Sequence, residues 1–400
     1  MFIRYVDIRY SYADWRNGRE GVLAENPFVY GEVVPRAAFV GRDIELGRLS
    51  ADLADGQKIF LISPRRYGKS SLIAQAFTTL GRKRIATLEI TVSSFSSYVA
   101  FLEGYTRALA ALDQSTASRS WLADLFTNYR PEVRAEAGGG VAVSFPSVRS
   151  AKDAAKLGAE VFALPARIAA RLRRRLVIAM DEFQAVESYE GAGVEEALRA
   201  AVQQQRQVGY VFAGSEPSLM EQMVSPRRPF YKAGPVLRLG RIDPDVFAKF
   251  VEDRFRKSGL SPEAGIGAAI VEVSGNLPYD VQRLAHETWD DSTALKRRRV
   301  GLDDVHATLR RLLAEQEVFF ETIWQRLTLA QRAVLRAVVI ERGAAILGGD
   351  VRARHRLGGA SSVQTSLAAL QRLDVIARED DGRYAVVDLL MREWVARKTF

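Results

Sequence analysis

The residues best suited to chemistry lie in segment 63–70, which reads SPRRYGKS. It matches the phosphate-binding pattern G-x-x-x-x-G-K-[ST], except that Ser63 takes the first glycine's place. Gly68 would let the backbone curl so that successive amides face an anion, and the helix that follows would add its positive dipole. Lys69 would neutralise β and γ phosphates, and the Ser70 hydroxyl would ligate Mg2+. The segment therefore predicts a site for ATP and Mg2+.

A pair of carboxylates, Asp181 and Glu182, follows the apolar run 176–180. Carboxylates that leave the carboxyl end of a buried parallel strand face the bound ligand. Asp181 would hold Mg2+, through water or through Ser70, and Glu182 would polarise the attacking water as a general base. Taken alone, the pair is also compatible with a helix N-cap and a first-turn acid. Beside a phosphate-binding loop, the catalytic interpretation is favoured.

Two further residues are candidates for the same site. Ser215 follows the apolar segment 210–213 and would orient the water or contact the γ phosphate, unless it only caps the helix expected near Pro217. Arg228 lies in the loop 225–231 and would stabilise charge on the transferring phosphoryl group, unless it is simply solvated. We expect Ser215 to lie next to Asp181 if their strands are neighbours.

The elements that must position these residues alternate between strands and helices. Short apolar runs at 58–62, 84–92, 176–180, 209–214 and 236–239 predict strands, and the segments between them have helical periodicity. This alternation indicates an α/β fold with a parallel sheet. The glycine-rich stretch 135–140 and the alternating stretch 141–148 are interpreted as a surface insertion.

The remainder of the chain predicts additional domains. Residues 243–325 are almost entirely helical in pattern, and a hairpin with Asp381-Gly382 in its turn is expected near the end. The expected division is an irregular N-terminal arm at 1–30, a P-loop core at 31–242, a helical lid at 243–325 and a winged helix at 326–400.

Composition limits the possible functions. The 400 residues are 48% hydrophobic and 26% charged, and the formal net charge is +9. Such a chain is expected to be soluble, multidomain and cytoplasmic, since no apolar run approaches a membrane span and the start does not resemble a secretory signal. The absence of cysteine excludes disulfides and thiolate chemistry. The positive charge suits an anionic partner, although the basic runs 171–175 and 296–299 also resemble the last turns of helices.

From about residue 27 onward the chain resembles the archaeal-type ATPase family, P-loop proteins close to the AAA+ and STAND groups. The segments that carry this resemblance are FVGR at 39–42, PRRYGKSSL at 64–72, MDEFQ at 180–184, AGS at 213–215, PFY at 229–231 and GNLPY at 275–279. Their number and order make chance agreement unlikely.

The resemblance implies further site residues. It places Val40 and Gly41 by the adenine, puts Ser215 at the sensor-1 position, and brings Pro278 against the nucleotide from the lid. Pro278 stands where origin-recognition relatives often have a sensor-2 arginine, which implies slow, switch-like hydrolysis. The full set of expected nucleotide-binding residues is Val40, Gly41, Arg65, Arg66, Tyr67, Gly68, Lys69, Ser70, Ser71 and Pro278.

The C-terminal region resembles a winged helix, with helices near 329–341, 350–355 and 360–373 before the hairpin. Val363, Leu367, Leu370 and Leu373 would face its core, and the outer face would carry Ser361, Ser362, Gln364, Thr365 and Arg372. That face would suit a DNA major groove. Residues 325–400 carry 13 Lys/Arg against 8 Asp/Glu, but the wing tip 379–381 is acidic, so docking on the ATPase core or on a partner protein stays open.

The leading hypothesis is an ATP-dependent switch that acts through the winged helix on duplex DNA or on a protein. The main alternative is a DNA-binding regulator that senses ATP without turnover. A small-molecule kinase is disfavoured by the lid and the winged helix, and an oligomeric remodelling motor is a fourth reading. No membrane partner is expected, whereas a nucleotide-dependent oligomer is compatible with the sequence.

Overall fold

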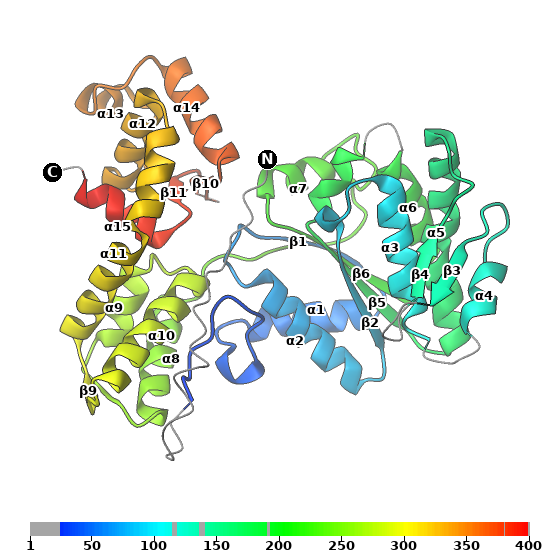
Figure 1. Cartoon of the computed structure of the whole chain (residues 1–400), viewed down its shortest axis with the longest axis horizontal. Coiled ribbons are helices and arrows are strands. Elements are labelled where there is room, and N and C mark those ends of the chain that lie inside the picture. Colours follow the sequence, from blue (N-terminus) through cyan, green and yellow to red (C-terminus); the bar gives the residue numbers. More distant parts are fainter. Residues whose placement is uncertain (1–24, 114–117, 136–140, 190–192, 380, 399–400) are drawn as a thin grey trace.

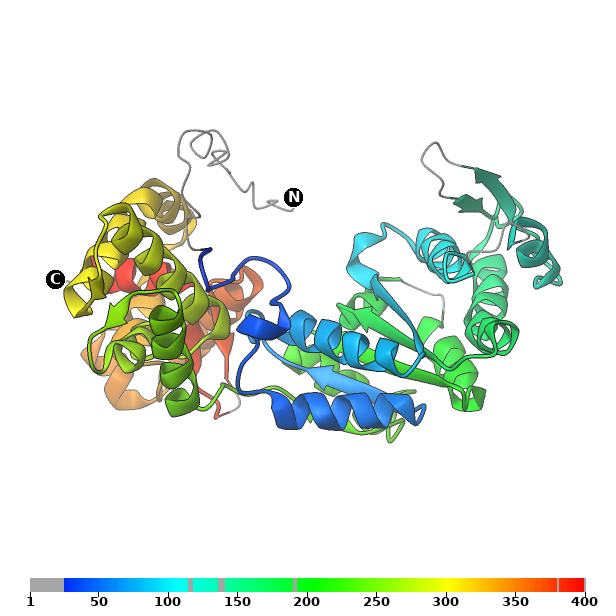
Figure 2. The ribbon, with the colours of Figure 1, turned by 90° about the horizontal axis from the view of Figure 1, so that it is seen from below.

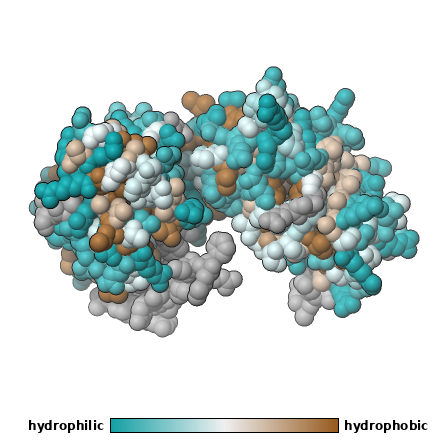
Figure 3. Space-filling model, turned by 90° about the horizontal axis from the view of Figure 1, so that it is seen from above, coloured by the Kyte–Doolittle hydropathy of each residue, from teal (hydrophilic) through white to brown (hydrophobic). Residues whose placement is uncertain are grey.

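The computed structural model describes residues 25–113, 118–135, 141–189, 193–379 and 381–398. Two lobes make up the molecule (Figure 1): the sheet with its covering helices forms one, and the lid together with the C-terminal helices forms the other. Turning the molecule by 90° shows the same division (Figure 2). Hydrophilic side chains cover most of the face seen in Figure 3, with hydrophobic ones scattered among them.

A five-stranded sheet forms the centre of the first lobe. Its strands are β1 (Lys58–Ile62), β2 (Ala86–Thr91), β5 (Leu176–Asp181), β6 (Val208–Gly214) and β7 (Val236–Arg238), in the order β2-β5-β6-β1-β7. Every pairing in this sheet is parallel. The predicted strands and the parallel α/β class are confirmed. All residues of β5 and β6 are buried, because helices cover both faces of the sheet.

Two separate apolar layers hold these helices on the sheet. On one face, α1 (Asp43–Ala54) and α2 (Lys69–Arg82) pack through residues such as Leu49, Leu53 and Leu72. On the other, a larger layer holds α3 (Tyr98–Ala110), α5 (Ala151–Leu172), α6 (Val194–Gln204) and α7 (Pro217–Met223). Ile44, which fits the apolar spacing of α1, is 85% exposed because it lies in the first turn, away from the sheet. Short 3-10 helices η2 (Arg36–Ala38), η3 (Val92–Ser94) and η4 (Phe183–Ser188) complete this lobe.

An insertion follows α3, as the glycine-rich sequence indicates. It contains α4 (Ser118–Asp124) and an antiparallel hairpin of β3 (Glu132–Ala135) and β4 (Val141–Ser144). The first of these strands alternates charged and apolar residues, Glu132-Val133-Arg134-Ala135, but it lies before the predicted alternating stretch and was not predicted. Residues 136–140 of the predicted break lie outside the described residues.

The lid contains α8 (Pro244–Lys257), α9 (Ile266–Val273), α10 (Pro278–Ala294) and α11 (Leu302–Arg326), with a short parallel pair of β8 (Ser261–Pro262) and β9 (Arg299–Val300). Residues 26–30, which belong to the expected irregular N-terminal arm, pack on this lid. Phe28 is buried beside Phe255, and the Asn26 amide donates to the carbonyl oxygen of His286.

The C-terminal part has the three helices and the hairpin of the expected winged helix: α12 (Leu329–Ile340), α13 (Gly349–Arg354), α14 (Ala360–Arg372), β10 (Ile376–Arg378) and β11 (Tyr384–Val386). A last helix, α15 (Leu389–Arg397), was not expected; its Trp394 packs on Phe320 and Trp324 of α11. One apolar core therefore runs from the lid into the winged helix. Leu373 was expected in that core but is 57% exposed, because α14 ends at Arg372 and the helical period stops there.

Both basic runs lie mostly beyond the helix ends in which they were expected. Helix α5 ends at Leu172 and α10 at Ala294, so Arg173–Arg175 and Lys296–Arg299 follow those helices. Among the helices that the structure describes, none is both long and apolar enough to cross a bilayer.

Candidate functional site

The loop 63–68 connects the carboxyl end of β1, which lies between β6 and β7 in the sheet, to α2. Ser63 is fully buried; its amide donates to the Gly214 carbonyl (3.3 Å) and its hydroxyl to the Pro64 carbonyl (2.8 Å). Ser63 is not among the residues with positive φ, so the loop does not need glycine's conformational freedom at this point. Serine at position 63, in place of the first glycine of the motif, is therefore compatible with the backbone conformation of the loop.

The N-terminus of α2 has the features of an anion site. Gly68, its N-cap, has a φ of 89°, a conformation that suits glycine, and no side chain caps the helix. The first amides of an α-helix have no acceptor within the helix and point outward with the positive end of the dipole. A phosphate at this position would receive hydrogen bonds that no side chain of the protein supplies.

Lys69 connects the loop to the two carboxylates after β5. Its ammonium lies 2.7 Å from Asp181 Oδ1 and 3.5 Å from Glu182 Oε1, and the residue is only 7% exposed. The parallel strand order places β1 and β5 on either side of β6, so side chains that leave their carboxyl ends meet above β6. The three residues that the sequence assigned to one site are thus brought together.

Glu182 is held by three groups. Its Oε2 accepts hydrogen bonds from the Ser215 hydroxyl and the Gln184 amide, both 2.6 Å long, while Oε1 faces Lys69. Burial alone would raise the pKa of Glu182, but Lys69 and these two hydrogen bonds outweigh burial and leave that pKa below its ordinary value. Glu182 is therefore ionised at neutral pH. Ser215 lies beside the carboxylate pair, as expected from adjacent strands.

Gln184 and Glu89 belong to the site although the sequence analysis gave them no role. A Cβ on Gly214 would lie 2.6 Å from Gln184 Oε1, so the glycine before Ser215 makes room for the glutamine. Glu89 interrupts the apolar pattern of β2; burial and the charge of Asp181 raise its pKa, against the effect of Lys69. A lone acid in an otherwise uncharged strand was the signal that would have identified Glu89.

The residues assigned to the adenine side lie on the segment before α1. Gly41 has a φ of 65°, and a Cβ there would lie 2.5 Å from Ile242 Cγ2, so a larger residue would collide with the start of the lid. Val40 packs at the edge of the core shared by the lid and the winged helix. Ser70 is exposed, whereas the Ser71 hydroxyl accepts a hydrogen bond from the Val34 amide at 3.1 Å. In this structure Ser71 thus supports the neighbouring backbone.

The two arginines of the loop contact the winged helix. Arg65 lies 2.6 Å from Asp374, at the end of α14, and Arg66 lies 3.2 Å from Asp388, the N-cap of α15. Arg66 also donates to the Val387 carbonyl (3.1 Å). The phosphate-binding loop and the C-terminal domain are therefore joined by ion pairs between residues more than 300 positions apart.

The lid contacts the same loop. The amide of Tyr279, which follows Pro278 at the start of α10, donates to the Arg66 carbonyl at 3.4 Å, and the Arg66 guanidinium lies 4.9 Å from the Tyr279 ring centre. Asp280, 3.7 Å from Arg66, is 2% exposed. Burial raises the pKa of Asp280 to about 7, although Arg66 acts in the opposite direction. Pro278 thus stands at the contact between the lid and the loop.

Arg228 lies in a different environment from the one expected for it. Its guanidinium donates to Glu187 and Glu195, both at 2.5 Å, between η4 and α6. A role for Arg228 at the nucleotide stays a prediction, and it requires that these two ion pairs open.

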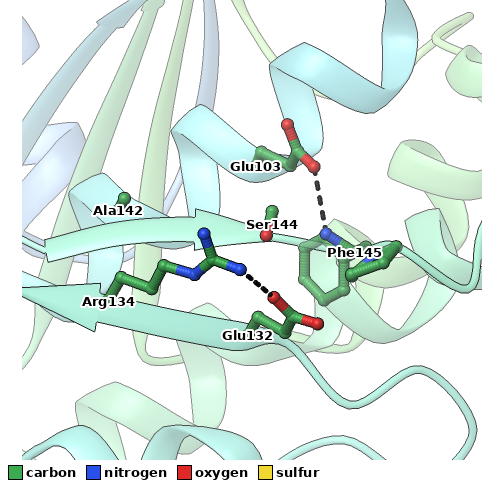
Figure 4. A pocket seen from close by; sticks show the side chains of 7 residues that line it. Glu103, Glu132, Arg134, Ala142, Ser144 and Phe145 are labelled. Atoms are coloured by element: carbon green, nitrogen blue, oxygen red, sulfur yellow. Dashed lines mark hydrogen bonds and ion pairs between the residues drawn. The ribbon is translucent and has the colours of Figure 1, made fainter.

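A separate hollow of about 520 Å³ lies in the insertion (Figure 4). Glu132 and Arg134, both on β3, pair along one side of it, and Glu103 of α3 accepts a hydrogen bond from the Phe145 amide. No residue of the loop 63–70 lines it. Within the described ranges, no group of three or more histidine, aspartate or glutamate side chains is arranged to hold a metal ion.

Comparison with solved structures gives matches along nearly the whole chain. The Walker-type ATPase PABY2304 of Pyrococcus abyssi matches with a TM-score of 0.60 at 16% identity, covering 91% of this chain and 99% of that one. The Orc2 protein of Aeropyrum pernix, solved in ADPNP-ADP complexes, matches at 0.53 and 10% identity (94% and 98% covered). The Orc1 protein of the same organism, solved in complex with DNA, matches at 0.51 and 12% identity (92% and 96% covered).

The chain has the fold of a P-loop ATPase. A family model described as "Probable winged helix domain" matches residues 318–397, which adds the C-terminal domain to that fold. No curated protein matches the chain by sequence. The P-loop ATPase fold thus accounts for the parallel sheet, and the family match accounts for the domain whose acids contact the phosphate-binding loop.

Proposed function

We propose that this protein is a Mg2+-dependent ATPase of the AAA+/STAND-like type that acts as a nucleotide-dependent switch. The observation that carries the proposal is the pairing of Arg65 and Arg66 with Asp374 and Asp388. These ion pairs connect the loop that would hold ATP to the domain that would bind DNA or a protein partner. In this proposal the P-loop core spans 31–242, the lid 243–325 and the winged helix 326–400.

The site residues divide the chemistry among them. Lys69 would neutralise the β and γ phosphates, and the uncapped amides of α2 would bind the same oxygens. Ser70 and Asp181 would hold Mg2+; both contacts that Asp181 makes with Lys69 and the Glu182 amide use Oδ1, so Oδ2 would face the metal. Mg2+ would supply positive charge on the phosphate oxygens and would take its other ligands from phosphate and water. This donor set fits Mg2+ better than a metal that needs an all-protein cage.

Glu182 would polarise the attacking water, and Ser215 would orient the water and the Glu182 carboxylate. The groups that lower the pKa of Glu182, which are Lys69, Ser215, Gln184 and Arg65, also make its carboxylate a weaker base. Hydrolysis is therefore expected to be slow unless a partner or a movement of the lid rearranges these contacts. This is the property of a switch rather than of a fast motor.

Coupling to the winged helix follows because the phosphates of ATP and the acids of the winged helix would compete for Arg65 and Arg66. A nucleotide's phosphates beside the loop 63–68 would attract the same guanidinium groups that Asp374 and Asp388 hold. The Arg65 pair is half exposed on both sides and contributes little, about 0–1 kcal/mol. The Arg66 pair is mostly shielded, at 18% and 21% side-chain exposure, so it carries more of the coupling.

The test is ATP affinity in the double variant Asp374→Asn/Asp388→Asn. We expect ATP to bind roughly 5- to 10-fold more tightly, because removing about 1 kcal/mol of competing interaction corresponds to that factor. The control is Asp350→Asn/Asp381→Asn, which removes the same charge from exposed positions of the winged helix that do not contact the loop. Equal affinity in the wild type and both variants would exclude the proposed coupling.

A sensor that binds ATP without turnover is the second candidate, and the restraint on Glu182 favours it. The outer face of α14 (Ser361, Ser362, Gln364, Thr365 and Arg372) is exposed, as a DNA-reading helix would require. Steady-state phosphate release, measured with and without duplex DNA, separates the two candidates. Release above background supports the ATPase, and binding with no release under either condition supports the sensor.

A further inference from the structure

The opposite end of the sheet carries a second concentration of charge that the proposed ATP site does not use. A pocket of about 530 Å³ lies where α2 and α5 end and where β2 and β5 begin. Its lining contains five cations, Lys83, Arg84, Arg173, Arg174 and Arg175, and one acid, Asp55. The phosphate-binding loop follows the carboxyl end of β1, so this pocket is on the far side of the core from it.

Most of these cations have no partner within the described part of the chain. Arg175 donates to the Ala54 carbonyl and lies 3.8 Å from Asp55. No ion pair or side-chain hydrogen bond engages Lys83, Arg84, Arg173 or Arg174 among the described residues, and all four are exposed. They are available to a ligand from solvent.

Helix dipoles do not account for this much charge. The carboxyl ends of α2 and α5 each present about half a negative charge, which one neighbouring cation is enough to balance. Five cations and one carboxylate leave a clear positive excess, and like charges held in one pocket repel one another. An anionic ligand would remove that repulsion.

Hydrogen-bonded turns hold the cations on rigid elements. After α2, the amides of Arg84 and Ile85 donate to the carbonyls of Gly81 and Leu80. After α5, the amides of Arg173 and Arg174 donate to Ala170 and Ala169 in the same pattern. The two turns are equivalent helix-ending motifs, and β2 and β5, which follow them, pair side by side. The backbone of the pocket is therefore organised before any ligand arrives.

The chemistry of the lining selects a phosphate ligand. Arginine guanidinium groups match phosphate oxygens in pairs, and four of the five cations are arginines. Ala54 and Ile85 are the only apolar residues in the lining, and it contains no aromatic residue. Protein interfaces centre on large apolar and aromatic side chains, so an acidic protein is a poorer match than a chain of phosphates.

We propose that this pocket binds the phosphodiester backbone of a nucleic acid, independently of its sequence. The site is separate from the winged helix and does not depend on the proposed switch. It would hold nucleic acid against the ATPase core itself, through contacts to backbone phosphates alone.

The test measures binding of a fluorescent 20-base-pair duplex over a range of salt concentrations. The variant Lys83→Gln/Arg84→Gln/Arg173→Gln/Arg174→Gln removes the four unpartnered cations. The matched control Lys249→Gln/Lys257→Gln/Arg298→Gln/Arg299→Gln removes the same charge from exposed positions of the lid region that make no ion pair in the part of the chain described. We expect the pocket variant to bind at least about 10-fold more weakly near 0.1 M salt. The slope of log K against log salt should fall by roughly 2–4, at about 0.9 for each phosphate contact.

Equal losses in the pocket variant and the control, or no loss in either, would overturn the proposal, because binding would then follow total charge or another surface. Two competitors identify the anion. Displacement of the duplex by polyglutamate of matched charge would assign the pocket to an acidic protein, and displacement by millimolar inorganic phosphate at constant ionic strength would assign it to small anions. Unchanged ATP affinity in the pocket variant would show that its P-loop is intact, so failure here leaves the switch untouched.

Discussion

The two ends of the central sheet treat positive charge in opposite ways. At the carboxyl end, Lys69, Arg65 and Arg66 each lie against carboxylates of the same chain. At the amino end, four of five cations have no acidic partner within the described ranges. If the two proposals hold, a phosphate at the carboxyl end would have to displace internal partners, whereas a phosphate at the amino end would bind cations that have no such partners.

This difference distinguishes a site that acts as a switch from a site that only binds a ligand. Displacing an internal partner changes the contacts of another domain, and so an exchange of partners can move the lid or the winged helix. Adding a ligand to unpaired cations changes affinity without breaking a contact between domains. The comparison can be tested at each end separately.

The largest effect is expected at Glu182. Glu182→Gln keeps the shape of the side chain but removes the negative charge, so we expect ATP hydrolysis to fall by about 10²- to 10⁴-fold with ATP binding preserved. Lys69→Ala provides the contrast, since it removes the cation that would contact the phosphates and should abolish ATP binding. Single-turnover phosphate release and equilibrium ATP binding are the measurements. Undiminished hydrolysis in Glu182→Gln would remove that residue as the base.

The next effect concerns pH and the buried Asp280. Its pKa is raised to about 7 in the folded protein from an ordinary value of 3.8, so the folded state holds a proton that the unfolded state has lost between these values. Stability from this group is therefore present below pH 4 and falls as the pH rises through 7, by about 2 kcal/mol between pH 5 and pH 7.

Asp280→Asn cannot titrate, so its unfolding free energy should decline less over that range than that of the wild type. Urea unfolding at pH 5, 6 and 7 measures the difference. Asp303→Asn, a change at an exposed position in the first turn of α11, is the control. Parallel pH profiles for the wild type and Asp280→Asn would show that Asp280 is already ionised at pH 5.

The smallest effect is expected at the amino end. Arg173→Gln/Arg174→Gln relieves repulsion among unpaired cations, so the protein should be unchanged or more stable at low salt, by up to about 1 kcal/mol. Added salt should reduce that gain, because it screens the repulsion in the wild type. Thermal unfolding at two ionic strengths tests this, and a loss of stability would show that these arginines have partners in the folded protein.

The strands and the carboxylate cluster were predictable because each depends on a local pattern. Asp181 and Ser215 each follow a run of buried residues, and a parallel sheet brings such positions to one edge. The contacts of Arg65 with Asp374 and of Arg66 with Asp388 were not predictable, since no periodicity relates residues so far apart. Gln184 and Glu89 were missed for a related reason: their roles come from the packing of Gly214 and from the strand order.

The turn after α5 shows where a local signal misled. The basic run 171–175 suggested the last turn of a helix, because cations are favoured there. Helix α5 instead ends at Leu172, and the arginines continue into the turn. Arg173, Arg174 and Arg175 line the pocket at the amino end of the sheet, so the run marked a surface as well as a helix end.

The path of residues 26–42 limits how the two lobes can move. Phe28 is anchored in the lid, whereas the Val34 backbone is hydrogen-bonded to Ser71 and Gln75 of α2, so this segment connects the lobes before α1 begins. The chain crosses between the lobes again at Ile242, which touches Gly41 of the first crossing. Two connections that meet near one point fix the separation of the lobes at that point. The lid is therefore expected to pivot about it, and any signal from the nucleotide would be transmitted as a rotation about this point.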